Sequence, residues 1–250
     1  MTTDESTSEP DIWWGTFTIE TEEGGRWDVG PSSLWLYRTS HEWRLIHQMS
    51  TDRTKPDPMA DRSSANVPFT DDELAALVER SDEENLRISR HGFRQTPQRI
   101  TLKPALADRP VITRPEHPLR VPPGETITLY VSTPVWLQVL RAEADQLIEE
   151  FPSHRMSDTW FGTSTTTGEL CYATRTAGRL RLDRLPLRRH RAVTPLEIEN
   201  SAPEPLLLER VQLPVPHLET YVTGRQTLWT QAVRMHRTEG RQGANVQIRE

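Results

Sequence analysis

The sequence predicts an all-β protein of antiparallel β-sandwich or barrel-like architecture, with two β subdomains and one short helix near residues 71–80. Apolar and polar residues alternate with a period of two over many short runs, as in strands with one buried and one exposed face. Turn-forming residues separate these runs, and 20 prolines are spread along the chain, as is typical of strand ends and edge strands. About a dozen or more such strands have to close into a barrel or stack in layers.

The alternation of apolar residues is clearest in two runs. Ile127, Leu129 and Val131 alternate with threonines and a tyrosine, and Leu196 and Ile198 alternate with glutamates. This pattern is typical of half-buried strands. In chain order, the expected strands are residues 13–19, 34–37, 42–49, 86–93, 99–102, 126–131, 135–139, 169–174, 196–199, 206–213, 218–222, 227–235 and 246–248.

Four clusters of turn-forming residues fall between the apolar runs. They are Gly-Gly at 24–25, Pro-Pro-Gly at 122–124, Asn-Ser-Ala-Pro at 200–203 and Thr-Gly at 223–224. Glycine and asparagine tolerate the backbone angles of tight turns, and proline presets one of them. We therefore expect a turn at each cluster.

One helix is expected over residues 71–80. Thr70 and Glu73 have the spacing of a capping box, in which each side chain satisfies a free backbone amide of the other residue. Leu74, Leu77 and Val78 follow as an apolar stripe at helical spacing. Residues 141–150 fit either a helix or a strand, and the sequence leaves that choice open.

The chain is expected to divide into four parts in sequence order. These are a disordered tail at 1–11, a tryptophan-rich β subdomain at 12–140 with the helix, a connecting segment at 141–168 and a second β subdomain at 169–250. Residues 50–66 contain Met59 as their only large apolar residue, so an exposed loop is predicted there.

Composition excludes several classes of protein. No window approaches the roughly 18 consecutive apolar residues of a membrane span. Eight tryptophans and a net charge of −6 are not typical of a disordered chain. The acidic balance disfavours a nucleic-acid binder. A single cysteine, Cys171, cannot form an internal disulfide, and the first residues lack an apolar signal core, so a cytoplasmic location is expected.

The most conspicuous segment for binding is the Asp-Thr-Trp-Phe-Gly run at 158–162, followed by several hydroxyl residues. Asp158, Trp160 and Phe161 could form a polar pocket with an aromatic floor for a sugar, a base or another planar ligand. The plainer interpretation is that both aromatic rings pack between sheets, which is the more common role of aromatics in β proteins. No Gly-Lys-Ser/Thr sequence follows, so a P-loop is not supported.

An arginine-rich run at 179–191 is the best candidate for an anionic partner such as a phosphate or an acidic protein patch. Six arginines and one acid lie within its thirteen residues. Arginine pairs bidentately with carboxylate and phosphate. Because acids are abundant elsewhere, these arginines could instead pair within the protein. The candidate binding residues are Arg179, Arg181, Arg188, Arg189 and Arg191.

Catalytic and metal-binding patterns are weak in this sequence. No two histidines have the spacing of a known metal motif, and no nucleophile elbow occurs. His47 and Cys171 fit buried strand positions better than a ligand or nucleophile role. His154, Asp158 and His190 could converge only through tertiary folding. No cofactor, metal or catalytic residue is therefore assigned.

Three features resemble an uncharacterised prokaryotic family described only as a conserved domain of unknown function. They are the Trp-Trp-Gly start at 13–15, the Pro-Pro-Gly-Glu turn at 122–125 and the Asp-Thr-Trp-Phe-Gly run that leads into residues 169–176. Genes of such families are reported beside small-conductance mechanosensitive channels. The resemblance implies a companion of a membrane protein, and it implies no catalytic residues.

The leading hypothesis is a cytoplasmic, non-catalytic interaction or regulatory module that binds a protein partner, such as the cytoplasmic domain of a channel. Trp160 would anchor the partner, and the arginines of the 179–191 run would contact its carboxylates or phosphates. The alternative is a hydrolase-type enzyme for a carbohydrate or a phosphorylated small molecule, with Asp158, His154 and His190 converging. Nucleic-acid binding is the third and weakest reading.

Overall fold

The computed structural model describes residues 12–49, 63–80, 85–162, 164, 166–239 and 244–249. For residues 63–65 it describes the backbone alone. Backbone contacts divide these residues into two compact units. Unit 1 comprises the described residues up to Lys103 together with Leu137–Phe151, and unit 2 comprises Pro104–Trp136 and the described residues from Pro152 onward. The chain therefore passes from unit 1 to unit 2, returns, and passes over again.

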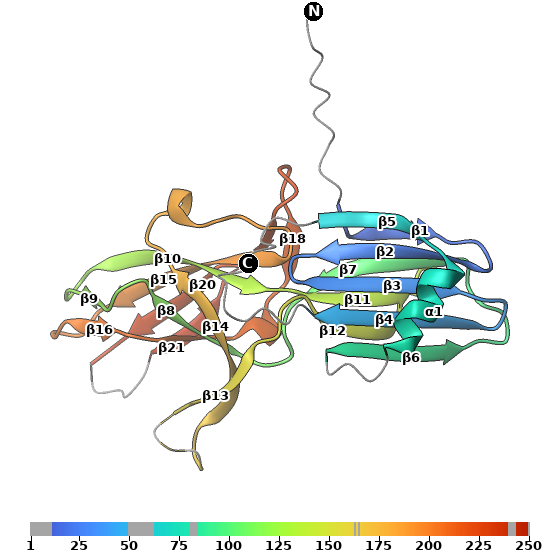
Figure 1. Cartoon of the computed structure of the whole chain (residues 1–250). Coiled ribbons are helices and arrows are strands. Elements are labelled where there is room, and N and C mark those ends of the chain that lie inside the picture. The colour runs from blue at the N-terminus through green and yellow to red at the C-terminus, as the bar shows by residue number, and fades with distance from the viewer. Residues whose placement is uncertain are drawn as a thin grey trace, which may run out of the picture. The chain divides into compact units, whose positions relative to one another are not determined.

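Unit 1 is a sandwich of two β-sheets (Figure 1). One sheet has the strand order β5-β2-β3-β4-β6 and pairs antiparallel throughout, and the other has the order β1-β7-β11-β12. The strands are β1 Gly15–Thr18, β2 Glu23–Val29, β3 Ser32–Arg38, β4 Glu42–Met49, β5 Ser63–Phe69, β6 Leu86–Gly92, β7 Arg99–Ala105, β11 Trp136–Arg141 and β12 Gln146–Pro152.

The core of unit 1 is rich in aromatic residues. The ring of Phe17 on β1 packs edge-on against Trp27 on β2, with 5.1 Å between the ring centroids. His47 on β4 stacks on Phe151 of β12 at 4.7 Å and shares a 2.6 Å hydrogen bond with the Ser32 hydroxyl. The expectation that His47 is a buried core histidine is therefore confirmed.

The predicted helix is present as α1 Asp71–Glu79, and it covers the outer face of the five-stranded sheet (Figure 1). The capping box predicted for Thr70 and Glu73 is formed in both directions. Leu74 and Leu77 pack on apolar side chains of the sheet, but Val78 is 44% exposed, so the stripe is narrower than expected.

The turn predicted at Gly24 and Gly25 is wrong, because both residues lie inside β2. A Cβ atom on Gly24 would stand 2.6 Å from the Phe69 ring, and one on Gly25 would stand 2.6 Å from the Trp27 ring. The glycines thus allow close packing of neighbouring rings on a strand, a role that the local sequence does not distinguish from a turn.

A polar cluster joins the two sheets of unit 1 between β6 and β12. The Glu149 carboxylate of β12 is ion-paired with Arg87 at 2.6 Å and with His91 at 3.0 Å, and it accepts a hydrogen bond from Ser89. Arg87, Ser89 and His91 alternate along β6, so their side chains share one face of that strand. Residues 141–150, left open by the sequence, therefore contribute to strands.

Unit 2 contains a six-stranded sheet, a four-stranded sheet and a two-stranded ribbon. In the six-stranded sheet, β15 pairs antiparallel with β10, and it pairs in parallel with β19 and β20. The four-stranded sheet has the order β13-β14-β8-β17. The strands are β8 Val111–Pro115, β9 Leu119–Val121, β10 Thr126–Pro134, β13 Ser157–Phe161, β14 Glu169–Gly178, β15 Arg191–Asn200, β16 Leu206–Leu208, β17 Val211–Leu213, β18 Thr220–Val222, β19 Leu228–Thr230, β20 Val233–Arg237 and β21 Asn245–Ile248.

The core of unit 2 lies between the two larger sheets. Leu129 of β10 and Leu196 of β15 belong to the same buried cluster as Val111 of β8 and Leu213 of β17. These side chains follow the period-two pattern of the sequence, and the sandwich-like all-β fold class is confirmed. The observed fold differs from the predicted antiparallel one in strand direction, because β14 pairs in parallel with β8 and β15 pairs in parallel with β19 and β20.

Asn200, the last residue of β15, forms hydrogen bonds with several neighbouring segments. It is fully buried, and its side-chain amide donates 2.9 Å hydrogen bonds to the carbonyl oxygens of Val121 and Glu204. Its backbone carbonyl accepts a hydrogen bond from Gly124, which has a φ of 77° in the predicted Pro-Pro-Gly turn. The turns predicted at 122–124 and 200–203 are thus connected through the backbone and the side chain of one residue, Asn200.

The expected boundaries at residues 140 and 168 differ from the two compact units, whose segments interleave along the chain. The predicted loop at 50–66 is corrected at its end, where residues 63–66 belong to β5. The predicted tail at 1–11 lies outside the described residues. None of the helices in the described part of the chain is long and apolar enough to cross a membrane.

Candidate docking site on unit 2

The β13–β14 hairpin carries the segment that the sequence analysis singled out. Ser157 pairs with Ala173, and Phe161 pairs with Glu169, in regular antiparallel register. β13 is the terminal strand of the four-stranded sheet, and no other described strand pairs with its outer edge (Figure 1). Unpaired backbone groups along such an edge are able to accept another strand.

Trp160 is the most prominent side chain of this hairpin. Its side chain is 45% exposed, and its cross-strand neighbour is Leu170 on β14. The plainer interpretation of the sequence, in which Trp160 is buried between sheets, is therefore wrong for this residue. Because side chains alternate along a strand, Trp160 shares a face with Asp158, while Phe161 points to the opposite face.

Asp158 is held by an ion pair within unit 2. Its carboxylate lies 3.1 Å from the Arg109 guanidinium, which in turn lies over the Tyr172 ring at 5.2 Å. The Tyr172 hydroxyl donates a 3.0 Å hydrogen bond to Asp108. Burial and this hydrogen bond raise the pKa of Tyr172 above its ordinary value. On the hairpin face that carries Trp160, Asp158 and Tyr172 are therefore held by contacts with Arg109 and Asp108.

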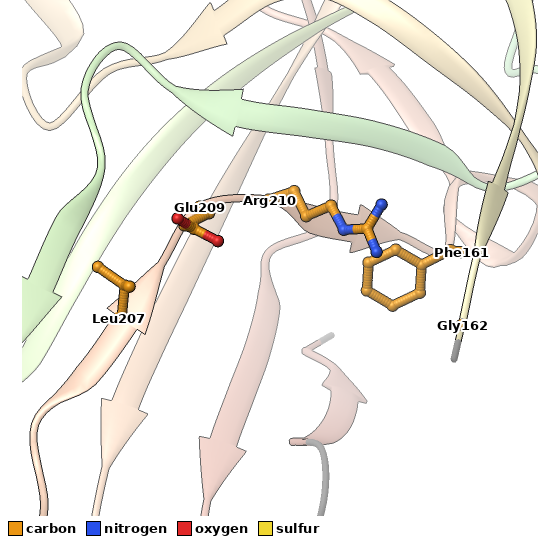
Figure 2. A pocket seen from close by; sticks show the side chains of 5 residues that line it. All are labelled: Phe161, Gly162, Leu207, Glu209 and Arg210. Carbon is orange, nitrogen blue, oxygen red and sulfur yellow. The ribbon is translucent and has the colours of Figure 1, made fainter. Parts of the chain in front are cut away.

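Phe161 lines an open surface pocket of about 290 Å³ with Gly162, Leu207, Glu209 and Arg210 (Figure 2). The Arg210 guanidinium carbon lies 5.3 Å from the centroid of the Phe161 ring. The sequence analysis did not select Glu209 or Arg210, because they lie about fifty residues from Phe161 and form no motif with it. Only the tertiary structure brings them together.

The arginine-rich run does not form one continuous surface. Arg179 is ion-paired with Glu116, and Arg181 is ion-paired with Asp183 at 2.5 Å. The hydrogen bonds from the two guanidinium groups hold the pKa of Glu116 and of Asp183 below the usual range. These two arginines therefore have carboxylate partners inside the protein, while Arg188 and Arg189 are partly buried.

Arg191 was expected at the surface, and this expectation is corrected by its burial to 6% exposure in β15. Its guanidinium donates a 2.9 Å hydrogen bond to the Ser132 hydroxyl and a 2.6 Å bond to the Ser132 carbonyl, and it also reaches Thr176. Burial of the guanidinium among these oxygens gives Arg191 a place in the interior of unit 2.

His154, Asp158 and His190 do not form a metal site. Within the described ranges there is no group of three or more histidine, cysteine, aspartate or glutamate side chains placed to hold a metal ion. His190 is 2% exposed, whereas the Asp158 carboxylate is largely solvent-exposed and bound to Arg109. His190 and Asp158 therefore lie in different environments, one buried and one exposed.

Cys171 is fully buried on β14, as the sequence predicted. Its Sγ accepts a 3.5 Å hydrogen bond from the Gln212 amide and donates one of 3.4 Å to the Glu169 carbonyl. Burial, reinforced by the Glu169 charge, raises the pKa of the Cys171 thiol. A raised pKa lowers the fraction of reactive thiolate at any given pH.

We expect iodoacetamide at about pH 8 to leave Cys171 unmodified in the native protein and to modify it fully in concentrated urea, because the thiol is both buried and protonated when folded. Mass spectrometry of the intact chain measures the extent of modification. Equal rates of modification in buffer and in urea would contradict the burial of this thiol.

Comparisons with known proteins give one match. A family model with the description "Protein of unknown function (DUF432)" matches residues 13–250. Neither the curated proteins nor the solved structures give a match.

Proposed function

The chain belongs to the DUF432 family of proteins of unknown function, and we propose that it is a non-catalytic interaction module that binds a protein partner through its β13–β14 hairpin. The observation that carries this proposal is Trp160, a tryptophan that is 45% exposed on a strand whose outer edge is unpaired among the described residues. Tryptophan is enriched among the residues that dominate binding energy at protein interfaces.

The edge of β13 favours a partner that binds as an extended strand. Such a segment would hydrogen-bond to the backbone of β13, and its alternate side chains would contact the two faces of the hairpin. The Asp158–Arg109 ion pair and the Tyr172–Asp108 hydrogen bond connect the two strands of the hairpin to residues 108 and 109 and so help to fix its position. A docking element that is already ordered loses less conformational entropy on binding.

The proposed location, the proposed partner and the secondary contacts come from the sequence. Cys171 is the single cysteine of the chain and is buried as a free thiol, which supports a cytoplasmic location. The family resemblance supports a prokaryotic source. The family resemblance makes the cytoplasmic domain of a small-conductance mechanosensitive channel the first partner to test. Arg188 and Arg189 are proposed as secondary contacts for acidic groups of that partner, together with the outer parts of Arg179 and Arg181.

Trp160→Ala is expected to weaken partner binding about 30-fold, because truncating a central interface tryptophan costs about 2 kcal/mol or more. Tyr221→Ala is the matched control, since Tyr221 is a 47% exposed aromatic residue on β18 of the same unit. The measurement is the dissociation constant of the purified full chain and its variants for the purified channel domain or for another partner identified by reciprocal capture.

Two results would oppose this proposal. If Trp160→Ala and Tyr221→Ala bind the partner as tightly as the unmodified chain does, the hairpin is not the docking element. If the purified chain hydrolyses carbohydrate or phosphate esters, and the activity is lost with Asp158→Asn, the enzyme alternative is favoured instead.

A further inference from the structure

Arg210 lies over the ring of Phe161 and forms no ion pair with any of the residues that the structure describes. Arg109, Arg179 and Arg181 of unit 2 are each paired with an aspartate or glutamate. Across the described part of the chain, no carboxylate oxygen lies within ion-pair distance of Arg210, and its guanidinium carbon lies 5.3 Å from the centroid of the Phe161 ring. An arginine held in place by an aromatic ring but not neutralised by an acid is suited to receive an anion.

The contact of the Arg210 guanidinium with the Phe161 ring limits which part of Arg210 a ligand can reach. A guanidinium that lies over a ring presents its N–H donors in its own plane, away from the ring face. A carboxylate matches this edge with two parallel hydrogen bonds. Figure 2 shows the Arg210 guanidinium beside the Phe161 ring, with Glu209 and Leu207 at the other end of the pocket.

The size and charge of the pocket narrow the class of ligand. A volume of about 290 Å³ is at the lower end of the range for small-molecule sites, so one or two side chains fit better than a whole metabolite. Glu209 adds a negative charge to the same lining and disfavours a phosphate dianion more than a carboxylate monoanion. Leu207 and Phe161 supply apolar surface for the methylene groups of an acidic side chain.

We infer that the Phe161–Arg210 pocket binds the side-chain carboxylate of an aspartate or glutamate in an extended protein segment that pairs with the edge of β13. Phe161 is itself part of β13, so alternate side chains of an added strand would face the side of the sheet that carries the pocket. This inference rests on the proposed function and adds to it the chemistry of the partner.

The test selects linear random peptides displayed on phage against the immobilised full chain, the Arg210→Gln variant and the Arg225→Gln variant. Arg225 is an exposed arginine of unit 2 in the turn after β18, and it serves as the matched control. The best selected peptide is then synthesised with blocked ends and a fluorescent label, and its dissociation constant is measured by anisotropy.

The selected peptides are expected to share an acidic residue, and Arg210→Gln is expected to weaken binding of the synthesised peptide about 10-fold or more. Replacing the shared acid of the peptide by its amide should give the same loss, with little further loss when both changes are combined. Arg225→Gln should leave the dissociation constant unchanged, and amide NMR signals of 157–162 and 207–210 should shift when the peptide binds.

The possible failures separate the two proposals. Peptides that need Trp160 but bind Arg210→Gln unchanged would overturn the carboxylate site and leave the docking hairpin in place. Amide signals near Arg210 that shift with inorganic phosphate but not with the acidic peptide would overturn the choice of a carboxylate. Peptides that are insensitive to both Trp160→Ala and Arg210→Gln, or no selected peptides at all, would overturn both proposals.

Discussion

Trp43→Ala is expected to lower the free energy of unfolding of unit 1 by about 3–5 kcal/mol. Trp43 lies on β4 with no exposed surface, and its indole N–H donates a 3.1 Å hydrogen bond to the Pro97 carbonyl. Truncation to alanine therefore removes a large buried ring together with its hydrogen bond and leaves a cavity, while the Pro97 carbonyl keeps the 3.1 Å hydrogen bond that it accepts from Arg38. The lost ring contacts and the cavity therefore make up most of the expected effect.

Amide hydrogen exchange measures this effect residue by residue, which is useful because a chain with two compact units need not unfold in one step. Protection should fall most for the amides of β3 and β4, which pair along their whole length. The matched control is Trp160→Ala, the same substitution at a 45% exposed position, for which a loss below about 1 kcal/mol is expected. A loss of similar size for both variants would show that Trp43 is not a core residue.

Asn200→Ala is expected to destabilise unit 2 by about 2–4 kcal/mol. The substitution leaves the carbonyl groups of Val121 and Glu204 without their donor, and it leaves the backbone amide of Ala202 without the Asn200 side-chain oxygen that accepts its 3.3 Å hydrogen bond. An unsatisfied buried polar group costs more than the hydrogen bond itself contributed. The volume removed is small, so most of the expected effect is polar.

Hydrogen exchange in β9, β10 and the end of β15 measures the consequence, because these segments meet at Asn200. Asn245→Ala on β21 is the matched control, since that residue is exposed. The interpretation is wrong if Asn200→Ala and Asn245→Ala change protection equally. A loss of protection greater for Asn200→Ala, and centred on these strands, is the expected result.

Local patterns were reliable where one face of an element is buried and the other is not. The period of two in Leu129, Val131, Leu196 and Ile198 matches their burial in the core of unit 2. The capping box at Thr70 also formed as predicted, because it requires only residues three positions apart. The same local reasoning was wrong for Gly24 and Gly25, since a side chain there would collide with Phe69 and Asn66, which are distant in sequence and come close only through folding.

The candidate site was predictable in part. The Trp160 segment stands out by composition, and the structure places that tryptophan on an edge strand with nearly half of its surface exposed. Arg210 carries no local signal, because its proposed role in binding depends on the Phe161 ring and on the absence of an ion pair with Arg210 among the described residues. The opposite holds for Arg191, which belongs to a conspicuous basic run but lies buried beside Ser132.

By itself, the sequence determined the all-β class, the position of the helix and many of the strands, because side-chain alternation and capping depend on residues a few positions apart. Tertiary structure alone decided which strands are neighbours. β12 joins a sheet with β1, more than a hundred residues earlier, and β15 pairs in parallel with β20. Many strands of this chain have similar apolar faces, so several pairings would bury them about equally well locally. Which pairing is adopted therefore depends on how all strands of a unit pack together.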